Sequence, residues 1–561
     1  MIPPYMPGQY PPPVQYQPQM PDPFMNVYHP PPIQYQPQML DPFMNAYPVQ
    51  YPLQIISPFG GGAHQPISLK SVGIVFVPGS VYHDDQPAEP KPVSAASAAS
   101  PSEDKLELSA KSALSPLQGQ QELPCMVSLK GVSKDLDEIE RVRPGLDLVC
   151  VIDISGSMGG IKVELVRQTI GFLVTKLTKH DRLSIVVFDD QAYRVCPLLS
   201  CDEVNRPILE DYSDRFTAEG GTNMLAGLEC GLTVLAGRTT INTVTSLFFL
   251  SDGQDNETNT ALARSQATLT RYRGLIQGEF TLHTFGYGSD HDSNIMCNMA
   301  DQGLGAFHYV EKFESIAEAF ADSFGGLVSQ VARSIEVRLE LLPAPVVCRI
   351  TKMYTKAGDQ VYTLPAIMAN ESKDLVFLLD VAETEVSETV DFAAVRATVK
   401  YLSVAGVQVT ETVDLTLSVL PKGVKSELNV REDVLVNFYR VKGAEILKEV
   451  SVMAENRQFK QAQVCLQRGI TEFRESLVAS HALIAAILRD LEDAVGRVRS
   501  AETWNAGGAA QVKSAGMNHY AQVASSNTAF YAQPQQAAFN MQFQAYQQAQ
   551  PPKLPGPPHR P

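Results

Sequence analysis

The stretch that decides the fold is "LDLVCVIDISGSMGG", residues 146–160. Its first seven residues form a largely apolar run that predicts a short buried strand, and Asp153 follows at the end of that strand. The next segment, "IKVELVRQTIGFLVTKLTK" (161–179), repeats apolar residues at three- and four-residue spacing, which is typical of an amphipathic helix. The stretch therefore predicts a strand, a turn that carries hydroxyl groups, and a helix.

Strands and helices continue to alternate over residues 142–332. The runs "LSIVVF", "TSLFFL" and "EFTLHTF" are apolar on both faces, as the strands of a buried parallel sheet are. Helical patterns such as "MLAGLECGLTVLAG" lie between them. The alternation predicts a doubly wound α/β domain over residues 142–332, with helices on both faces of a mostly parallel sheet.

Two further folded regions flank this pattern. Residues 335–421 contain extended, mostly alternating runs such as "AAVRATVKYLS", which predict a β-sandwich. The run "PCMVSLKGV" alternates in the same way, so residues 121–141 are expected to give the sandwich one strand, with the α/β domain inserted after it. Residues 427–500 show helical periodicity and predict a helical hairpin with a third helix packed on it.

The remaining segments are predicted to lack a packed core. Residues 1–65 hold a Pro/Gln/Tyr-rich tandem repeat with a period of 19 residues, and residues 501–561 are rich in Gln and Pro, so both are expected to be disordered arms. Residues 66–120 are expected to form a linker with the strand-like island "ISLKSVGIVFVP". Two hypotheses remain for the arms: they are solvated tails, or they drive weak self-association.

Composition excludes several classes of function. The chain has 561 residues, a formal net charge of −16, and eight cysteines without a C-x-x-C pair. An acidic body repels nucleic acid and anionic membranes, and this cysteine usage argues against a disulfide framework or a zinc module. The sequence shows neither a signal peptide pattern nor an apolar run long enough to cross a bilayer. We therefore expect a cytoplasmic protein that neither binds nucleic acid nor inserts into membranes.

The turn after the first strand allows three interpretations, of which a phosphate site is the first. Its glycines do not have the spacing of either Gly-rich phosphate-binding motif, and Asp153 places a negative charge where the anion would lie. A related interpretation makes Asp153 a phosphatase nucleophile, but such enzymes need a second Asp two residues later, where Ser155 stands. The sequence argues against both.

The second interpretation is a serine hydrolase. "SGSMG" differs from the nucleophile-elbow pattern only at its first residue, and Ser157 would attack with Asp252 and His283 as its partners. His283, however, lies within a predicted strand, where a core histidine is the simpler expectation. The interpretation also leaves Asp153, Ser155 and Thr222 without a role.

The third interpretation is a metal site. Oxygen-bearing side chains occur at the ends of predicted strands and on loops, where ligands of open α/β sheets bind. They are Asp153, Ser155 and Ser157 in the first turn, Thr222 in "AEGGTNM", and Asp252 in "LFFLSDG". Carboxylate and hydroxyl oxygens suit Mg²⁺ or Mn²⁺ better than zinc. The pattern predicts one such ion at this edge of the sheet.

These five residues resemble the metal-ion-dependent adhesion site (MIDAS) of von Willebrand factor A (VWA) domains, in which D-x-S-x-S is followed by a Thr and an Asp on later loops. The resemblance implies that Ser155, Ser157 and Thr222 bind the ion directly, while Asp153 and Asp252 act mainly through water. It also implies an open coordination position for a carboxylate of a protein partner. The implied function is therefore a non-enzymatic binding module, an adaptor, a scaffold or a structural component.

The resemblance extends beyond this domain to intracellular VWA proteins, among them plant RING-type ubiquitin ligases. "RPGLDLVCVIDISGSMGG", "GYGSDHDSNIMCNMADQGLGAFHYV" and "WNAGGAAQ" carry it. Because this sequence contains no Cys/His zinc module, the resemblance implies at most the substrate-binding part of a ligase assembly. The other alternative is a structural protein that forms homo-oligomers or a larger assembly through its arms.

Four more polar residues near the predicted site have two interpretations each. Glu219, Asp255 and Glu257 are solvated loop charges or form a second cation site next to the first. His291 is a loop or helix-cap residue or a ligand.

Overall fold

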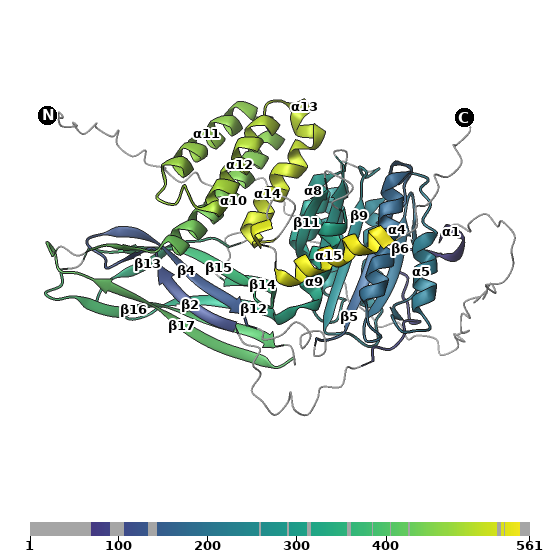
Figure 1. Ribbon diagram of the computed structural model, residues 1–561, viewed down its shortest axis with the longest axis horizontal. Helices are drawn as coiled ribbons and strands as arrows, with labels where there is room; N and C mark the ends of the chain where they lie inside the picture. The colour runs from purple at the N-terminus through teal and green to yellow at the C-terminus, as the bar shows by residue number, and fades with distance from the viewer. Residues whose placement is uncertain are drawn as a thin grey trace, which may run out of the picture. The chain divides into compact units, whose positions relative to one another are not determined.

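The computed structural model of the protein (Figure 1) describes residues 69–89, 106–132, 143–256, 260–288, 291–310, 316–355, 361–383, 385–403, 406–424, 427–523, 529–531 and 533–549. The predicted repeat arm, residues 1–65, lies outside these ranges.

The α/β domain is built on an eight-stranded sheet with the order β1-β7-β6-β5-β9-β10-β11, and β8 pairs with β6 beside this path. The strands are β1 Ile74–Val75, β5 Leu146–Asp153, β6 Arg182–Phe188, β7 Ala192–Arg194, β8 Leu199–Ser200, β9 Val244–Ser251, β10 Thr281–Tyr287 and β11 Leu304–Val310. Strands β6, β5, β9, β10 and β11 pair in parallel. Every residue of β5, β6 and β9 is buried, which explains why their sequences are apolar on both faces.

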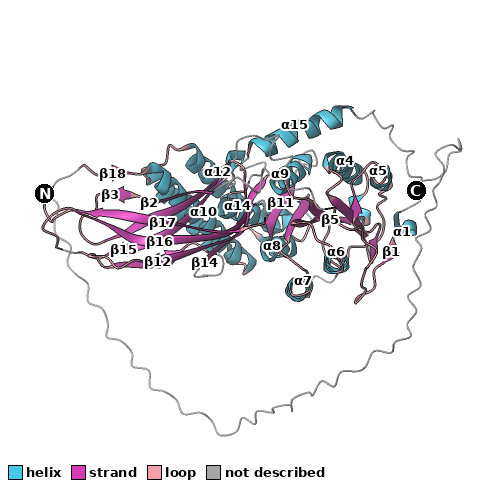
Figure 2. Ribbon diagram, turned by 90° about the horizontal axis from the view of Figure 1, so that it is seen from below, coloured by secondary structure: helices cyan, strands magenta, loops and turns pink. Residues whose placement is uncertain are grey.

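Helices cover both faces of this sheet, with α4, α5 and α9 on one side and α6, α7 and α8 on the other (Figure 2). Their bounds are α4 Ile161–Lys176, α5 Arg206–Asp214, α6 Met224–Ala236, α7 Ala261–Arg273, α8 Ser293–Gln302 and α9 Ile316–Val328. One apolar cluster lies on each face of the sheet. The predicted doubly wound α/β fold is confirmed. The strand order reverses at β5, so the carboxyl ends of β5 and β9 flank a topological switch point.

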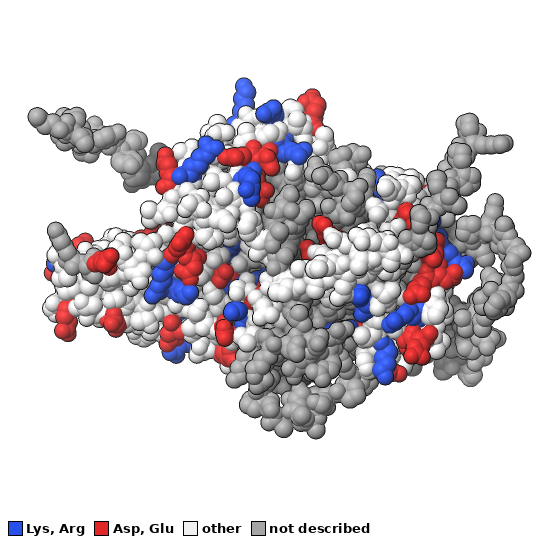
Figure 3. All heavy atoms as spheres, viewed as in Figure 1, with Lys and Arg blue, Asp and Glu red and all other residues white. Residues whose placement is uncertain are grey.

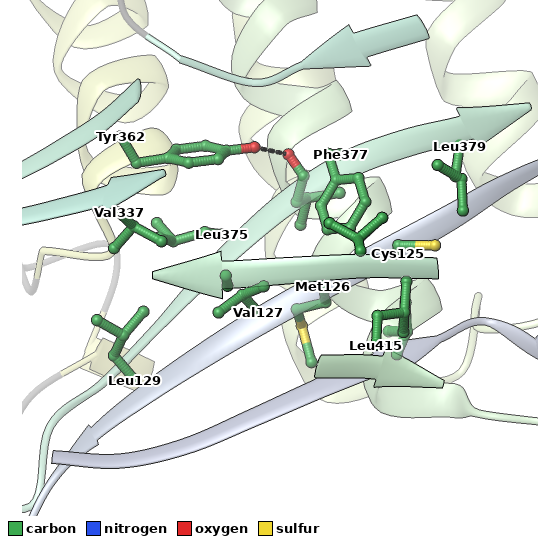
Figure 4. Packing of buried hydrophobic residues seen from close by; sticks show 14 of the residues in the cluster. Cys125, Met126, Val127, Leu129, Val337, Tyr362, Leu375, Phe377, Leu379 and Leu415 are labelled. Carbon is green, nitrogen blue, oxygen red and sulfur yellow. Dashed lines mark hydrogen bonds between the residues drawn. The ribbon is translucent and has the colours of Figure 1, made fainter. Parts of the chain in front are cut away.

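Two four-stranded sheets form the β-sandwich, with the orders β13-β15-β4-β2 and β14-β12-β16-β17. Their strands are β2 Leu106–Ser112, β4 Gln121–Gly131, β12 Gln330–Leu341, β13 Cys348–Met353, β14 Val361–Met368, β15 Ser372–Val381, β16 Val390–Ser403 and β17 Gln408–Val419. Phe377 and Cys125 from the first sheet and Leu415 from the second share one core (Figure 4). Strand β4 pairs with β15 from Gln121 to Lys130, so the α/β domain is inserted between two sandwich strands.

The predicted linker over residues 66–120 needs correction at both ends. Residues 106–112 form β2, whose Leu106 is buried, although the Ser/Ala-rich sequence around it suggested a linker. The predicted island contains helix α1 (Leu69–Val72) and strand β1, which adds an antiparallel edge to the α/β sheet. Further along, Arg194 holds this segment through Asp84 and Asp85, at 2.6 and 2.7 Å.

The C-terminal region is helical. Helices α10 (Glu432–Glu455), α11 (Phe459–Glu475) and α12 (Ala482–Arg497) form the predicted hairpin and third helix. The structure contradicts the predicted disordered tail over residues 501–523, 529–531 and 533–549. These residues form α13 (Ala501–Thr503), a π-turn (Trp504–Gly508), α14 (Ala509–Ala521), a 3₁₀ turn (Ala529–Tyr531) and α15 (Pro534–Ala549).

The physical reason for this correction is clearest in α15. Its sequence has no charged residue, and its surface appears as an uncharged band in Figure 3. Gln and Ala are nonetheless good helix formers, and Phe539, Phe543 and Tyr546 lie at helical spacing. Phe539 packs against Phe324 of α9, and Phe543 against Phe172 of α4, with ring centroids 5.3 and 4.7 Å apart. No helix in the described ranges is both long and apolar enough for a membrane span.

Asp322 of α9 makes the stability of the protein pH-dependent. It is buried beneath α15, where Asn540 Nδ2 donates to its Oδ1 at 3.0 Å. The pKa of Asp322 is raised from 3.8 to about 7, mainly by burial and also by the nearby Glu318, although the hydrogen bond from Asn540 lowers it. Between these two pH values the folded protein keeps a proton that the unfolded chain releases, so this contribution to stability is lost as the pH rises.

We therefore expect Asp322→Asn to flatten the pH dependence of stability between about pH 4 and 7. Above pH 7 the variant should be more stable than the wild type by about 4 kcal/mol, because it carries no buried charge. Urea unfolding with saturating Mg²⁺ at several pH values measures this difference. Parallel pH profiles of variant and wild type would contradict it.

Candidate metal centre

Asp153 is the last residue of β5 and is completely buried. Ser155 N donates to its Oδ1 at 2.8 Å, and Ser251 Oγ donates to its Oδ2 at 2.5 Å. Ser251 is the last residue of the neighbouring strand β9. The carboxylate is therefore fixed in one orientation at the switch point.

The two serines lie on the turn that connects β5 to α4. A short 3₁₀ turn, Gly156–Met158, bends the chain, and Gly156 N donates to Gly220 O at 3.0 Å. This geometry brings Ser155 Oγ and Ser157 Oγ within 3.0 Å of each other. Two hydroxyl groups thus converge beside the buried Asp153.

Asp252 directly follows β9 and is also buried. Because β5 and β9 are adjacent parallel strands, with Ile152 opposite Leu250, Asp153 and Asp252 lie at the same edge of the sheet. Ser157 Oγ donates to Asp252 Oδ1 at 2.7 Å. Lys162 Nζ forms an ion pair with Asp252 Oδ2.

Thr222 comes from the loop before α6. The loop is fixed by Asn256, whose N donates to Thr222 O at 2.9 Å and whose Oδ1 accepts from Thr222 N at 3.2 Å. A Cβ atom added to Gly253 would lie only 2.9 Å from Thr222 Oγ1, so the Thr222 hydroxyl packs directly against the residue after Asp252. The structure thus brings all five predicted residues to one sheet edge.

This packing gives a specific prediction for Gly253→Ala. The added methyl group would displace the Thr222 hydroxyl, and metal affinity should fall by about tenfold while the fold is kept. Gly496→Ala is a matched control, because a Cβ there meets no atom within 4 Å. Calorimetric titration with Mg²⁺ measures both. Equal affinities in the two variants would show that the position of Thr222 does not matter.

The electrostatics of the site favour a bound cation. The pKa of Asp153 is raised to about 6, mainly by burial and also by the charge of Asp252, although hydrogen bonds from Ser155 and Ser251 lower it. Two carboxylates buried at one edge need positive charge nearby. With three hydroxyl groups they form a hard-oxygen set that fits Mg²⁺ or Mn²⁺. Within the described part of the chain, no group of three or more His, Cys, Asp or Glu side chains could hold a metal ion, so this mixed set of carboxylates and hydroxyls is the candidate.

The structure does not support the serine hydrolase interpretation. His283 lies on β10 opposite Phe248 of β9, four residues before Asp252, which is about 13 Å along an extended strand. It is half-buried, its Nδ1 accepts from Ala306 N at 3.3 Å, and desolvation lowers its pKa to about 4. Ser157 donates to Asp252 instead. His283 is a half-buried strand residue whose ring lies against Phe248, at 5.5 Å between ring centroids.

The other polar residues near the site have structural roles. Asp255 is buried rather than solvated, accepts from Met224 N at 2.8 Å at the start of α6, and has a pKa raised by burial. Glu219 pairs with Lys70 at 3.1 Å. His291 is a buried loop residue whose Nδ1 lies 2.9 Å from Gly288 O, and Glu257 lies outside the described residues.

A family model of the von Willebrand factor type A domain matches residues 147–322, which run from β5 into α9 and include all five candidate ligands. The chain contains a von Willebrand factor type A domain. The VWA protein of Catenulispora acidiphila has a similar solved structure, with a TM-score of 0.54, 16% identity, and 74% of this chain and 98% of that chain covered. The 74% of this chain that is covered is more than the VWA domain alone, so the similarity of fold extends into the flanking regions.

Three relatives are similar in sequence to part of the chain. The uncharacterized protein sll0103 of Synechocystis is 28% identical over 213 residues, which is 38% of this chain and 48% of that protein. The E3 ubiquitin-protein ligase WAV3 of Arabidopsis thaliana is 25% identical over 270 residues, 46% of this chain and 34% of the ligase. Human inter-alpha-trypsin inhibitor heavy chain H1 is 28% identical over 218 residues, which is 37% of this chain and 23% of the human protein. The chain thus matches less than half the length of each relative.

Proposed function

We propose that the VWA domain holds one Mg²⁺ or Mn²⁺ ion and binds an acidic side chain of a protein partner through it. Asp153, Ser155, Ser157, Thr222 and Asp252 would hold the ion. The observation that carries the proposal is the convergence of these side chains from three separate loops at one sheet edge. When bound, the ion supplies positive charge and a coordination position for the carboxylate of the partner.

In this proposal the chain is an adaptor, a scaffold or a structural component of an assembly, without a catalytic residue of its own. The wide α/β sheet and the sandwich would give the binding edge a rigid support. All eight cysteines are free thiols, which fits a reducing compartment, and we place the chain in the cytoplasm.

The test compares partner binding with and without the ion. In a pull-down from native extract, partners should be retained with Mg²⁺ and released by chelation. Partners that stay bound after chelation and bind equally to the Asp153→Asn variant would contradict the metal-bridged mechanism.

The similarity to WAV3 favours one more specific role, the substrate-binding part of a ubiquitin-ligase assembly. In that case the retained proteins should include a ligase subunit that supplies the transfer chemistry. A self-assembling structural protein is the remaining alternative. Its oligomers should persist when the divalent cation is removed, which size measurements would show.

A further inference from the structure

Lys162 is a charged residue at the metal centre to which the proposed function gives no role. It lies in the first turn of α4, two residues after Gly160. Its Nζ forms an ion pair with Asp252 Oδ2 and donates to Ser157 O at 3.2 Å. The Lys162 side chain is 22% exposed, and that of Asp252 is fully buried. The ammonium group of Lys162 therefore already neutralises Asp252, one of the two buried carboxylates.

The contacts around Asp252 occupy both of its oxygens. Ser157 Oγ donates to Oδ1 at 2.7 Å and Lys162 pairs with Oδ2. Ser155 Oγ continues this set of contacts at 3.0 Å from Ser157 Oγ. If a divalent ion binds Asp252 and the two serines, it must therefore replace these contacts between side chains of the protein.

Lys162 is suited to give way to such an ion. An ammonium group on a flexible stem can leave its partner more easily than a guanidinium held by two parallel hydrogen bonds. The Lys162 side chain is partly exposed, so the ammonium group has only a short way to move into solvent. The lysine and a divalent ion carry charge of the same sign, so each weakens the hold of Asp252 on the other.

We propose that Lys162 is an internal counter-ion that competes with the divalent cation for Asp252 and so sets the metal affinity of the site. This inference rests on the proposed function, because it assumes that the five side chains bind the ion. Its consequence is that the site loads at a higher metal concentration than the same oxygen atoms would without the lysine.

The test is calorimetric titration of the full chain with Mg²⁺. Lys162→Met should bind Mg²⁺ about tenfold more tightly than the wild type, because the competing charge is gone. Lys162→Arg keeps the charge and should bind Mg²⁺ no more tightly than the wild type. Lys130→Met is the matched control for net charge, since Lys130 is an exposed residue of sandwich strand β4.

A second measurement uses the unaltered protein and does not depend on how a variant folds. Amine-reactive labelling followed by mass spectrometry should modify Lys162 faster with Mg²⁺ than without it, since the ion releases the ammonium group from Asp252. Unchanged labelling, or unchanged affinity in Lys162→Met, would overturn the role of Lys162. Failure of the wild type itself to bind Mg²⁺ would instead overturn the proposed function.

Discussion

Asp153→Asn should lower the affinity of the protein for Mg²⁺ by at least about 100-fold. The amide keeps the shape of the carboxylate and can still accept a hydrogen bond from Ser155 N, so the turn after β5 should keep its conformation. What is lost is one of the two negative charges buried at the site. Residues that only hydrogen-bond to the ligands of a metal ion already contribute about 10- to 100-fold to its affinity. A charged residue of the ligand set itself should contribute at least as much.

The same variant separates metal binding from folding. A ligand present at about 100 times its Kd stabilises a folded protein by about 2.7 kcal/mol. Mg²⁺ should therefore raise the melting temperature of the wild type but not that of Asp153→Asn. Asp301→Asn, on the exposed end of α8, is the matched control and should respond like the wild type. An equal Mg²⁺ response in Asp153→Asn would rule out Asp153 as part of the metal centre.

Among the variants considered, Asp147→Ala should lower the free energy of unfolding the most. Asp147 is a fully buried residue of β5 and the one polar side chain among the first seven residues of that strand. It accepts from Arg182 Nε and Nη2 at 2.8 and 2.7 Å and from Arg238 Nη1 at 2.8 Å. Asn242 donates to it through N and Nδ2, each at 3.0 Å. One carboxylate thus serves two guanidinium groups that are almost completely buried.

Removal of this carboxylate leaves two buried positive charges uncompensated, which should cost about 3–5 kcal/mol of unfolding free energy. Asp147→Asn keeps an acceptor and should lose less. Asp414→Ala breaks the exposed pair with Arg396 and serves as the control, with only a small expected effect. Urea unfolding followed by circular dichroism measures all three. A loss in Asp147→Ala no larger than in the control would mean that the buried charges find other partners.

The α/β fold and the five candidate ligands could be predicted from the sequence because their signals are local. Asp153 and Asp252 each end a strand that is apolar on both faces, and parallel strands place such ends at one sheet edge. Thr222 follows two glycines in a short loop, and one of these, Gly220, has a φ of 84°. Each candidate ligand can therefore be recognised from about ten residues of the sequence around it.

The partners of buried charges could not be predicted in this way. Lys162 and Asp252 are 90 positions apart, and Arg238 lies 91 positions after Asp147. The sequence around Lys162 does not indicate that Asp252 is its partner, and the sequence around Arg238 does not indicate Asp147. The role of Asp255 as a buried cap of α6 was missed for the same reason, because the amide it accepts from belongs to Met224.

In the helices after residue 500, composition and periodicity point in opposite directions. The absence of charge and the many Gln residues in 534–549 suggested a solvated tail. The spacing of Phe539, Phe543 and Tyr546 carried the opposite signal, an amphipathic helix whose aromatic stripe needs a surface. That surface, formed by Phe172 of α4 and Phe324 of α9, exists only in the folded domain.

The most direct test of the central claim is to locate the ion. Crystals of the full chain grown with Mn²⁺ should give one strong anomalous difference peak per chain, surrounded by the oxygens of Asp153, Ser155, Ser157, Thr222 and Asp252. The peak should disappear in crystals of Asp153→Asn grown under the same conditions. A wild-type chain without a peak there, or with its strongest peak at another place, would contradict the account.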